Sequence, residues 1–257
     1  MKVLDIVIEE NIKIAEDIYL LSFKNKYIAE NYKPGNFVNI KIQDNSIYPL
    51  LRRPFSISYI QDDVVYIGYQ VIGVGTELLA KKKKGYILNI IGPLGNNFEI
   101  PQNIKSVSLI GGGMGIWPLY GLARQLSQNK VMFDVYLGFR NKEKSFFIEK
   151  FKDIAENIYI SSDDGSIGFK GNIIELFTSN KKNYEIIYSC GPKVMLRTLK
   201  DLNLNNQIYV SLEEKMACGI GACLGCSIKG ENDNIFHVCS DGPVFNIMEV
   251  NLNESKS

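Results

Sequence analysis

Four cysteines stand close together near the end of the chain, and closely spaced thiolates are ligands for metals. They follow the pattern C-x4-C-x2-C-x12-C, at Cys218, Cys223, Cys226 and Cys239. The first three match the C-x4-C-x2-C spacing of plant-type [2Fe–2S] sites, and the glycines between them would let a loop wrap around a cluster. Structural zinc sites more often pair two C-x2-C knuckles. The pattern therefore favours a [2Fe–2S] cluster, with zinc and disulfides as the alternatives.

A single histidine, His237, limits the other chemistry that this chain can perform. Nucleophilic catalysis of the Ser–His or Cys–His kind would have to use this one residue. A Rieske cluster needs two histidines, and the zinc sites of hydrolases are usually rich in histidine, so both are excluded. We expect His237 to be an exposed or packing residue near Cys239.

Composition and charge describe an ordinary folded protein. The chain has 257 residues, enough for one large domain or two to three small ones, and 46% of them are hydrophobic. The net charge of +1 gives no electrostatic reason to bind nucleic acid or an anionic membrane. Acidic residues interrupt the first apolar run, and the uncharged stretch 107–123 contains three consecutive glycines, so neither a signal peptide nor a membrane helix is predicted. We expect a cytoplasmic protein, in which reduced thiols disfavour disulfides.

The elements that must position these residues change character along the chain. Over residues 1–100, short runs rich in Ile, Val and Tyr are separated by turn residues, which predicts a small antiparallel β-barrel. One segment differs, because "GTELLAKKKKG" predicts a short helix from about Thr76 to Gly85. The expected strands cover residues 3–10, 18–23, 36–42, 55–60, 64–72 and 86–91.

Over residues 101–211, apolar strands alternate with helical patterns, which predicts a Rossmann-like parallel sheet with helices on both faces. The expected helices cover 116–128, 145–155, 171–179 and 192–202. The segment 212–257 is short and glycine-rich and lacks the apolar content for its own core, so we expect a metal to hold it together. The predicted fold class is therefore multidomain β plus α/β with a small cluster-binding segment.

Two motifs in the barrel have the chemistry to bind a flat, phosphate-bearing cofactor. In "RRPFSIS", Arg53 would pair with a phosphate, Phe55 would lie against a ring, and Ser56 would bond to the edge of the ring. In "GVGT", residues 73–76 open the barrel helix, where backbone N–H groups and the Thr76 hydroxyl would hold a pyrophosphate. Arginine and serine are common on strands, so a purely structural role remains an alternative for the first motif.

Two further motifs end strands of the α/β region. "GGGMGIWP" at 111–118 follows a strand and opens a helix, as a dinucleotide-binding loop does, although it lacks the G-x-G-x-x-G register. A structural turn is the alternative. "SCGP" at 189–192 ends a later parallel strand, at the edge where such sheets bind ligands, and by itself Cys190 is expected to be a packing residue.

Taken in order, the motifs R-P-F-S, G-x-G-T, G-G-G-x-G, C-G-P and the four cysteines resemble the ferredoxin–NADP reductase superfamily. That superfamily joins a flavin-binding barrel to a pyridine-nucleotide domain. The tail, "LEEKMACGIGACLGCSI" followed by "HVCSDGPVF", resembles the electron-transfer subunits of NAD-dependent dihydroorotate dehydrogenases. The resemblance extends over essentially the whole chain, but Trp117 stands where a smaller residue is expected.

The resemblance implies three redox sites. It implies FAD on the barrel, NAD(H) over the glycine loop and the C-G-P turn, and a [2Fe–2S] cluster on the four cysteines. The implied FAD residues are Arg53, Pro54, Phe55, Ser56, Tyr69, Gln70, Val71, Gly75 and Thr76; the implied NAD(H) residues are Gly111, Gly112, Gly113, Gly115, Cys190, Gly191 and Pro192; and the implied cluster ligands are Cys218, Cys223, Cys226 and Cys239.

The resemblance also implies a partner, an FMN-containing catalytic subunit that oxidises dihydroorotate to orotate in pyrimidine biosynthesis. The two are expected to form a heterotetramer with two copies of each. One alternative is the small subunit of a transhydrogenase or sulfide dehydrogenase, in which a carboxylate is expected in place of Cys218. Another is a zinc-bound, non-catalytic scaffold protein on the same fold.

Overall fold

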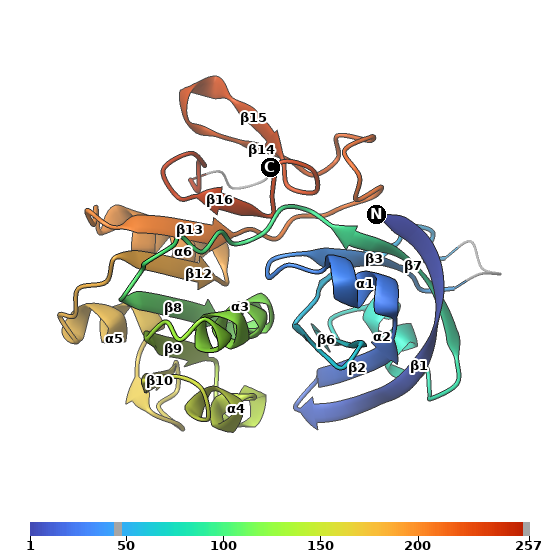
Figure 1. Ribbon diagram of the computed structural model, residues 1–257, viewed down its shortest axis with the longest axis horizontal. Coiled ribbons are helices and arrows are strands. Elements are labelled where there is room, and N and C mark those ends of the chain that lie inside the picture. The colour runs from blue at the N-terminus through green and yellow to red at the C-terminus, as the bar shows by residue number, and fades with distance from the viewer. Residues whose placement is uncertain (44–47, 254–257) are drawn as a thin grey trace.

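The first part of the chain is one seven-stranded antiparallel sheet that curves into a barrel (Figure 1). The structure, a computed structural model, describes residues 1–43 and 48–253. Residues along β7 alternate between buried and more exposed positions, as expected when one face of a strand packs on a core. The sheet has the order β4-β3-β7-β1-β2-β6-β5 and confirms the predicted barrel. Its strands are β1 (Lys2–Ala15), β2 (Ile18–Lys24), β3 (Phe37–Lys41), β4 (Arg53–Ser56), β5 (Tyr59–Gln61), β6 (Val64–Gln70) and β7 (Ile87–Leu94).

The strand predicted over residues 55–60 is two strands in the structure. β4 ends at Ser56 and β5 begins at Tyr59, with Ile57 and Ser58 fully buried between them. The backbone N–H of Ile57 bonds to Asn36, whereas that of Ser58 bonds to Tyr66. The two residues therefore pair with different neighbours, and the chain bends there.

Two short helices pack on the barrel; the sequence did not predict the first, and it predicted the second but placed its end too late. Helix α1 (Lys26–Asn31) was not predicted; the Asn25 side chain caps it by accepting from the Ile28 N–H at 3.0 Å. Helix α2 (Val74–Ala80) ends well before Gly85. The Asn11 side chain donates to the carbonyl oxygens of Leu79 and Lys82, at 2.8 and 2.9 Å, and so satisfies the end of this helix from a distant strand.

A second seven-stranded sheet follows, parallel in all but its last strand, and it confirms the predicted α/β architecture. Its order is β11-β10-β9-β8-β12-β13-β16, so the strand order reverses beside β8 (Figure 1). The strands are β8 (Val107–Gly112), β9 (Phe133–Phe139), β10 (Asn157–Ser162), β11 (Phe169–Lys170), β12 (Ile186–Cys190), β13 (Gln207–Ser211) and β16 (Val244–Asn246).

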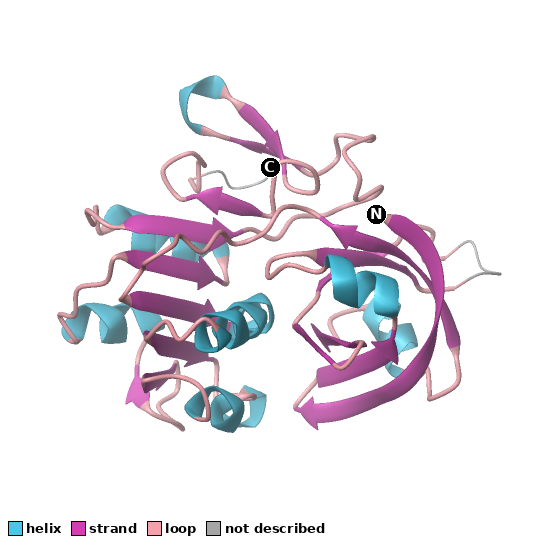
Figure 2. Cartoon of the chain, viewed as in Figure 1, coloured by secondary structure: helices cyan, strands magenta, loops and turns pink. Residues whose placement is uncertain are grey.

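Helices cover both faces of this sheet, as Figure 2 shows. Helices α3 (Ile116–Gln128) and α4 (Ile148–Lys152) pack on one face, and α5 (Ile173–Ser179) and α6 (Lys193–Asp201) on the other. The helix predicted over 145–155 is much shorter, because Phe147 has a φ of 61° and begins a new turn there. Phe146 and Phe147 instead pack against Trp117, with ring centroids 4.4 and 4.7 Å away.

The C-terminal segment packs on the end of the α/β sheet and shares its core. Strands β14 (Ser227–Lys229) and β15 (Ile235–His237) form a hairpin, and β16 pairs with β13. Cys226 and Cys239 lie in the same apolar cluster as Leu199 of α6. The remaining elements are 3-10 turns at Gly113–Gly115, Lys142–Lys144 and Glu231–Asp233. Within residues 1–43 and 48–253, no helix combines the length and apolar composition that crossing a membrane requires.

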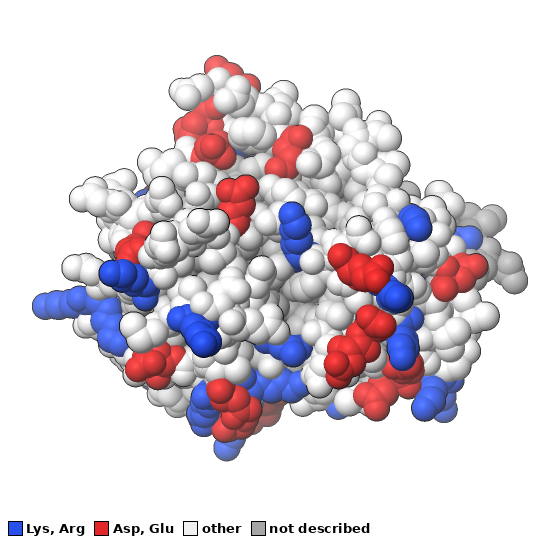
Figure 3. All heavy atoms as spheres, in the orientation of Figure 1, with Lys and Arg blue, Asp and Glu red and all other residues white. Residues whose placement is uncertain are grey.

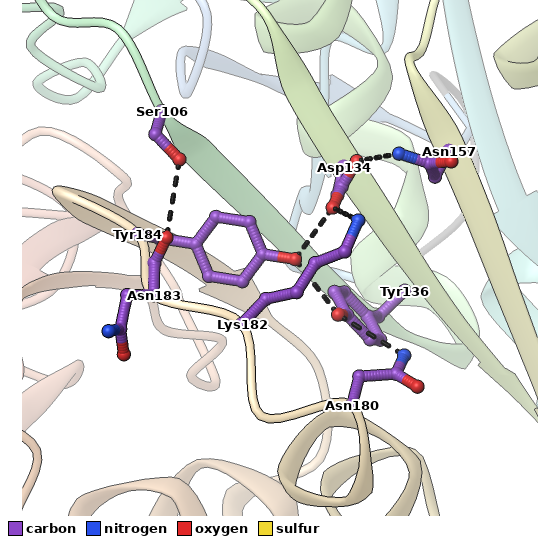
Figure 4. A network of polar contacts seen from close by, with 8 residues as sticks. All are labelled: Ser106, Asp134, Tyr136, Asn157, Asn180, Lys182, Asn183 and Tyr184. Atoms are coloured by element: carbon purple, nitrogen blue, oxygen red, sulfur yellow. Dashed lines mark hydrogen bonds and ion pairs between the residues drawn. The ribbon is translucent and has the colours of Figure 1, made fainter.

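A buried carboxylate fastens the connection between α5 and β12 to the sheet (Figure 4). Asp134 of β9 is 5% exposed and accepts from the Lys182 ammonium, the Tyr184 hydroxyl and the Asn157 amide, each at 2.7 Å. The Tyr136 and Tyr184 hydroxyls are 2.9 Å apart. Burial alone would raise the pKa of Asp134, but these hydrogen bonds lower it below its usual value.

We expect Asp134→Asn to lower the free energy of unfolding by about 2 kcal/mol, the range of hydrogen bonds to charged groups. Because the folded pKa is depressed, the carboxylate's contribution is present above the unfolded pKa and is lost as pH falls through the folded pKa. Denaturant unfolding between neutral pH and pH 3 should therefore show the variant and the wild type converging in acid. Asp62→Asn, the same change in an exposed turn, is the control. A difference that stayed constant with pH would contradict this role.

Candidate functional site

A cavity of about 370 Å³ lies between the barrel and the α/β region and gathers most of the implied flavin residues. Val71 is not among its lining residues and packs against the barrel core, and Gly75 lies beneath Arg53. The lining residues are Phe37, Arg53, Pro54, Phe55, Ser56, Gly68, Tyr69, Gln70, Ile72, Thr76, Met114, Trp117, Ser211, Leu212, Glu213, Glu214, Met216 and Pro243.

Aromatic packing fixes the barrel wall of this cavity. Tyr69 is 1% exposed, stacks on Tyr19 with centroids 5.5 Å apart, and donates its hydroxyl hydrogen to Asn11 at 2.8 Å. Phe55 meets the edge of the Tyr69 ring at 5.7 Å. Burial raises the pKa of Tyr69, so its hydroxyl stays protonated at neutral pH. The wall is therefore a rigid, largely apolar surface that fits a flat ring system.

The phosphate-binding part of the prediction rests on Arg53 and the start of α2. A Cβ added to Gly75 would lie 3.1 Å from Arg53 Nε, so glycine allows the guanidinium to approach the helix closely. Nη1 of Arg53 donates to the Leu51 carbonyl at 2.8 Å, which leaves other N–H groups of its fork for a ligand. The Thr76 hydroxyl accepts from Ile72 at 3.0 Å and donates to Gly73 at 2.9 Å. The hydroxyl hydrogen of Thr76 is therefore used within the loop. The Arg53 guanidinium and the backbone N–H groups remain as donors that suit a pyrophosphate.

Trp117 joins the two walls of the cavity. It is 1% exposed, and a Cβ added to Gly68 of β6 would overlap its indole ring. The Ser58 hydroxyl donates to the Trp117 carbonyl at 3.2 Å, which ties the start of α3 to the barrel. Trp117, where a smaller residue was expected, thus fills a space that only a glycine on β6 leaves open.

We expect Gly68→Ala to destabilise the protein by about 2 kcal/mol, as overpacking does, and to weaken flavin binding roughly tenfold as Trp117 is displaced. Thermal unfolding and titration of the flavin-free protein with FAD would measure the two effects. The double variant Gly68→Ala/Trp117→Phe, with a smaller ring, should recover part of both losses. A double variant as impaired as the single one would show that the Gly68–Trp117 contact is not the cause.

The glycine loop and the C-G-P turn meet at the point where the strand order reverses. Gly111 of β8 pairs directly with Cys190 of β12. A Cβ added to Gly115 would overlap the Cys190 carbonyl, and one added to Gly112 would lie 3.0 Å from Pro192. The two turns therefore touch backbone to backbone. This position, beyond the carboxyl ends of the parallel strands, is where sheets of this kind bind nucleotides.

Cys190 is buried where the two turns meet. It is 1% exposed, and burial, together with the nearby Glu213 charge, raises its thiol pKa. Cys190 is therefore a neutral thiol at physiological pH. This placement agrees with the packing role that the sequence predicted for it.

The sequence prediction missed the segment 211–216, which contributes Ser211, Leu212, Glu213, Glu214 and Met216 to the cavity lining. Glu213 lines the cavity, and desolvation by the surrounding protein raises its pKa above the usual value for a carboxyl group. Met216 also lines the cavity and lies just before Cys218, so this segment connects the cavity to the cysteine loop. One signal was available, because the carboxyl end of the last predicted parallel strand must lie at the same edge as the glycine loop.

The four cysteines of the C-terminal segment lie near one another. Cys218 interacts with Cys223, and Cys239 interacts mainly with Cys226 and also with Cys218. Cys226 and Cys239 are buried, whereas Cys223 is exposed. Across residues 1–43 and 48–253, no three His, Cys, Asp or Glu side chains converge as ligands of one metal ion. Four cysteines suit a two-iron cluster, because each iron of a [2Fe–2S] cluster takes two protein ligands.

Backbone N–H groups point at the sulfurs of this site, as cluster sites require. Cys218 Sγ accepts from Ile220 and Cys223 at 3.4 Å, and Cys239 Sγ accepts from Gly221 at 3.1 Å. Burial would raise the pKa of Cys218, but these backbone hydrogen bonds lower it to about 6. Burial and its Cys226 neighbour raise the pKa of Cys239 to about 12. The loop therefore stabilises the thiolate form of Cys218.

Comparison with known proteins agrees with this geometry. Residues 213–251 match the model of the iron–sulfur cluster binding domain of dihydroorotate dehydrogenase B. The chain is 39% identical to the dihydroorotate dehydrogenase B (NAD(+)) electron transfer subunit of Fusobacterium nucleatum, over 98% of this chain and 100% of that protein. It is 40% identical to the subunit of the same name from Geobacillus kaustophilus, over 93% of this chain and 95% of that protein.

Solved structures share the fold. An NADH-dependent reduced ferredoxin-NADP oxidoreductase, described for flavin-based electron bifurcation, superposes with a TM-score of 0.87 at 30% identity, covering 96% of this chain and 90% of that one. Phthalate dioxygenase reductase superposes with a TM-score of 0.66 at 19% identity, covering 91% of this chain and 75% of that one, and supports the fold alone. From the full-length identity to the curated subunits, the chain belongs to the family of dihydroorotate dehydrogenase B (NAD(+)) electron transfer subunits.

Proposed function

We propose that this chain is the oxidoreductase subunit that carries electrons from an FMN-containing dihydroorotate dehydrogenase catalytic subunit to NAD+. The observation that carries the proposal is the continuity of its sites: the segment that contributes Ser211 to Glu214 and Met216 to the interdomain cavity leads directly to Cys218 of the four-cysteine loop. When bound, a [2Fe–2S] cluster would carry single electrons, and FAD would exchange them for the hydride that NAD takes. The protein's own residues bind, orient and shield these groups.

The barrel residues hold the flavin in this proposal. Phe55 and Tyr69 form the apolar wall against which the ring system would lie, with Pro54, Ser56 and Gln70 on the same strands and Val71 just after β6. Arg53 would neutralise the pyrophosphate beside Gly75 and Thr76, because its guanidinium lies at the start of α2. Trp117 and Met114 close the cavity from the α/β side and exclude water.

The α/β residues hold NAD(H). The dinucleotide would lie over the backbone of Gly111, Gly112, Gly113 and Gly115 and the turn Cys190, Gly191 and Pro192, which pack closely at the switch point of the sheet because the loop residues are glycines. Glu213, whose pKa is raised, stands in the cavity near Cys190, where it would orient the reacting ring. Cys218, Cys223, Cys226 and Cys239 ligate the cluster.

The assembly and location complete the proposal. The chain divides into an FAD-binding barrel (1–100), an NAD-binding region (101–211) and a cluster-binding segment (212–257). Two copies pair with two catalytic subunits in the cytoplasm, as part of UMP biosynthesis. The relatives are named electron transfer subunits, which supports a separate catalytic partner.

Anaerobic titration of the purified chain with NADH tests the cofactor assignment. We expect the flavin absorption and the iron–sulfur absorption to bleach together, with an electron paramagnetic resonance signal of a reduced [2Fe–2S] cluster. If the flavin absorption alone bleached, the chain would be a simple flavin reductase. A colourless chain containing zinc would instead support a non-catalytic scaffold.

A further inference from the structure

A second cavity, of about 230 Å³, lies at the junction of the barrel and helix α3 and has no lining residue in common with the flavin cavity. We call it the seam cavity. Figure 1 places α1 and α3 opposite each other across this junction. We propose that the seam cavity binds a small oxyanion, a carboxylate or a phosphate. The lining residues are Tyr32, Lys33 and Pro34 before β3, Tyr59 and Ile60 of β5, and Gly121, Arg124, Gln125 and Gln128 of α3.

Three cations, Arg124, Lys150 and Lys33, lie at this cavity. The Arg124 guanidinium lies 5.1 Å from the centroid of the Tyr59 ring, and Lys150 Nζ donates to the Tyr59 hydroxyl at 3.1 Å. Lys33 also lines the cavity. No ion pair joins any of these three cations to an acidic group in the described part of the chain. Figure 3 shows Lys and Arg atoms along this junction.

The cavity also holds hydrogen-bond donors that the protein leaves unused. Arg124 Nη1 donates to the Ile60 carbonyl at 3.0 Å, and its fork carries four further N–H groups. The Tyr32 hydroxyl is buried against Gly121, and among the described residues it has no hydrogen-bond partner. A buried hydroxyl without a partner costs stability, so a ligand that accepts from it would be favoured.

These features select the class of ligand. An arginine fork flanked by lysine matches the planar oxygens of a carboxylate or the oxygens of a phosphate. The volume exceeds the roughly 30 Å³ of one water but falls below the roughly 300–1,000 Å³ of pockets for drug-sized ligands. A small metabolite anion therefore fits, and a nucleotide does not. Because the residues come from both sides of the junction, the anion would bridge the barrel to α3.

Isothermal titration calorimetry of the full-length protein, loaded with flavin and cluster, tests this site. The probes are sodium phosphate and sodium benzoate, with sodium chloride at matched ionic strength. We expect one probe to bind saturably with a Kd of about 1 mM or tighter, and the probe that binds identifies the ligand as a phosphate or a carboxylate. Arg124→Gln and Tyr32→Phe should each weaken it about tenfold, the effect of one charge-assisted hydrogen bond. Lys84→Gln, on an exposed turn, should leave the Kd unchanged.

Two results would overturn the proposal. One is the absence of saturable binding of either probe beyond the chloride control. The other is binding that survives both Arg124→Gln and Tyr32→Phe, which would place the anion at the flavin or nucleotide sites instead. Tyr32→Phe keeps the ring and removes only the unpaired hydroxyl, so it stays informative even if Arg124→Gln fails to fold.

Discussion

Cys226→Ser is expected to lower dihydroorotate-dependent NAD reduction by the complex more than 100-fold, since even changes around a metal's ligands cost about 10–100-fold. The residue is 2% exposed, and its sulfur accepts from the Cys239 N–H at 3.4 Å. A serine hydroxyl is a harder and far less acidic ligand than a thiol, so the inner pair of cysteines would no longer hold its iron. Oxidation of NADH by ferricyanide should persist, because it requires only the flavin and nucleotide sites.

Cys223→Ser separates loss of the cluster from loss of the fold. Cys223 is exposed, so its replacement removes little packing, yet it should abolish the same electron passage. Both variants should retain as much FAD per chain as the wild type. If either variant sustained wild-type turnover from dihydroorotate to NAD, the four cysteines would not form the electron path.

Gly115→Ala is expected to lower the rate of flavin reduction by NADH about 100-fold, the effect of displacing a reacting group by roughly 1 Å. The added Cβ would overlap the Cys190 carbonyl, and backbone atoms cannot turn aside as a flexible side chain can. The glycine loop must therefore separate from the C-G-P turn, which widens the proposed nicotinamide site. Stopped-flow flavin reduction measures the rate, and we expect a stability loss of about 2 kcal/mol.

Gly85→Ala is the control for this prediction. Gly85 has a φ of 85° and no atom within 4 Å of an added Cβ, so alanine there strains the backbone without overlapping anything. It should lose about 1 kcal/mol of stability and keep the wild-type rate. Equal rate losses in both variants would mean that general destabilisation explains the result. A Gly115→Ala protein with normal flavin reduction would place the nicotinamide elsewhere.

The two-sheet architecture could be predicted from the sequence because its periodicities are local. Single segments are enough to recognise the alternation along β7 and the continuous apolar run of β8, which ends in glycines. Helix α1 was missed because it is six residues long and buries only Ile28, too little for a helical period to register. The end of α2 was misplaced because Asn11, far away in sequence, supplies its C-terminal hydrogen bonds.

The candidate site was only partly visible for a similar reason. Motifs such as R-P-F-S concentrate their chemistry in neighbouring residues, so the sequence displays them directly. Glu213 and Trp117 line the cavity through the packing of two sheets, and neither carries a local pattern. The fit of Trp117 over Gly68 depends on two positions in different parts of the fold. Such pairs become visible only in three dimensions.

The most direct test is to measure NADH formation from dihydroorotate and NAD+ by this chain co-purified with an FMN-containing catalytic subunit, and by each subunit alone. The account predicts NADH formation by the complex only, with the catalytic subunit alone reducing artificial dyes and this chain alone leaving dihydroorotate untouched. A complex that oxidises dihydroorotate with a dye but forms no NADH would contradict the electron-transfer role.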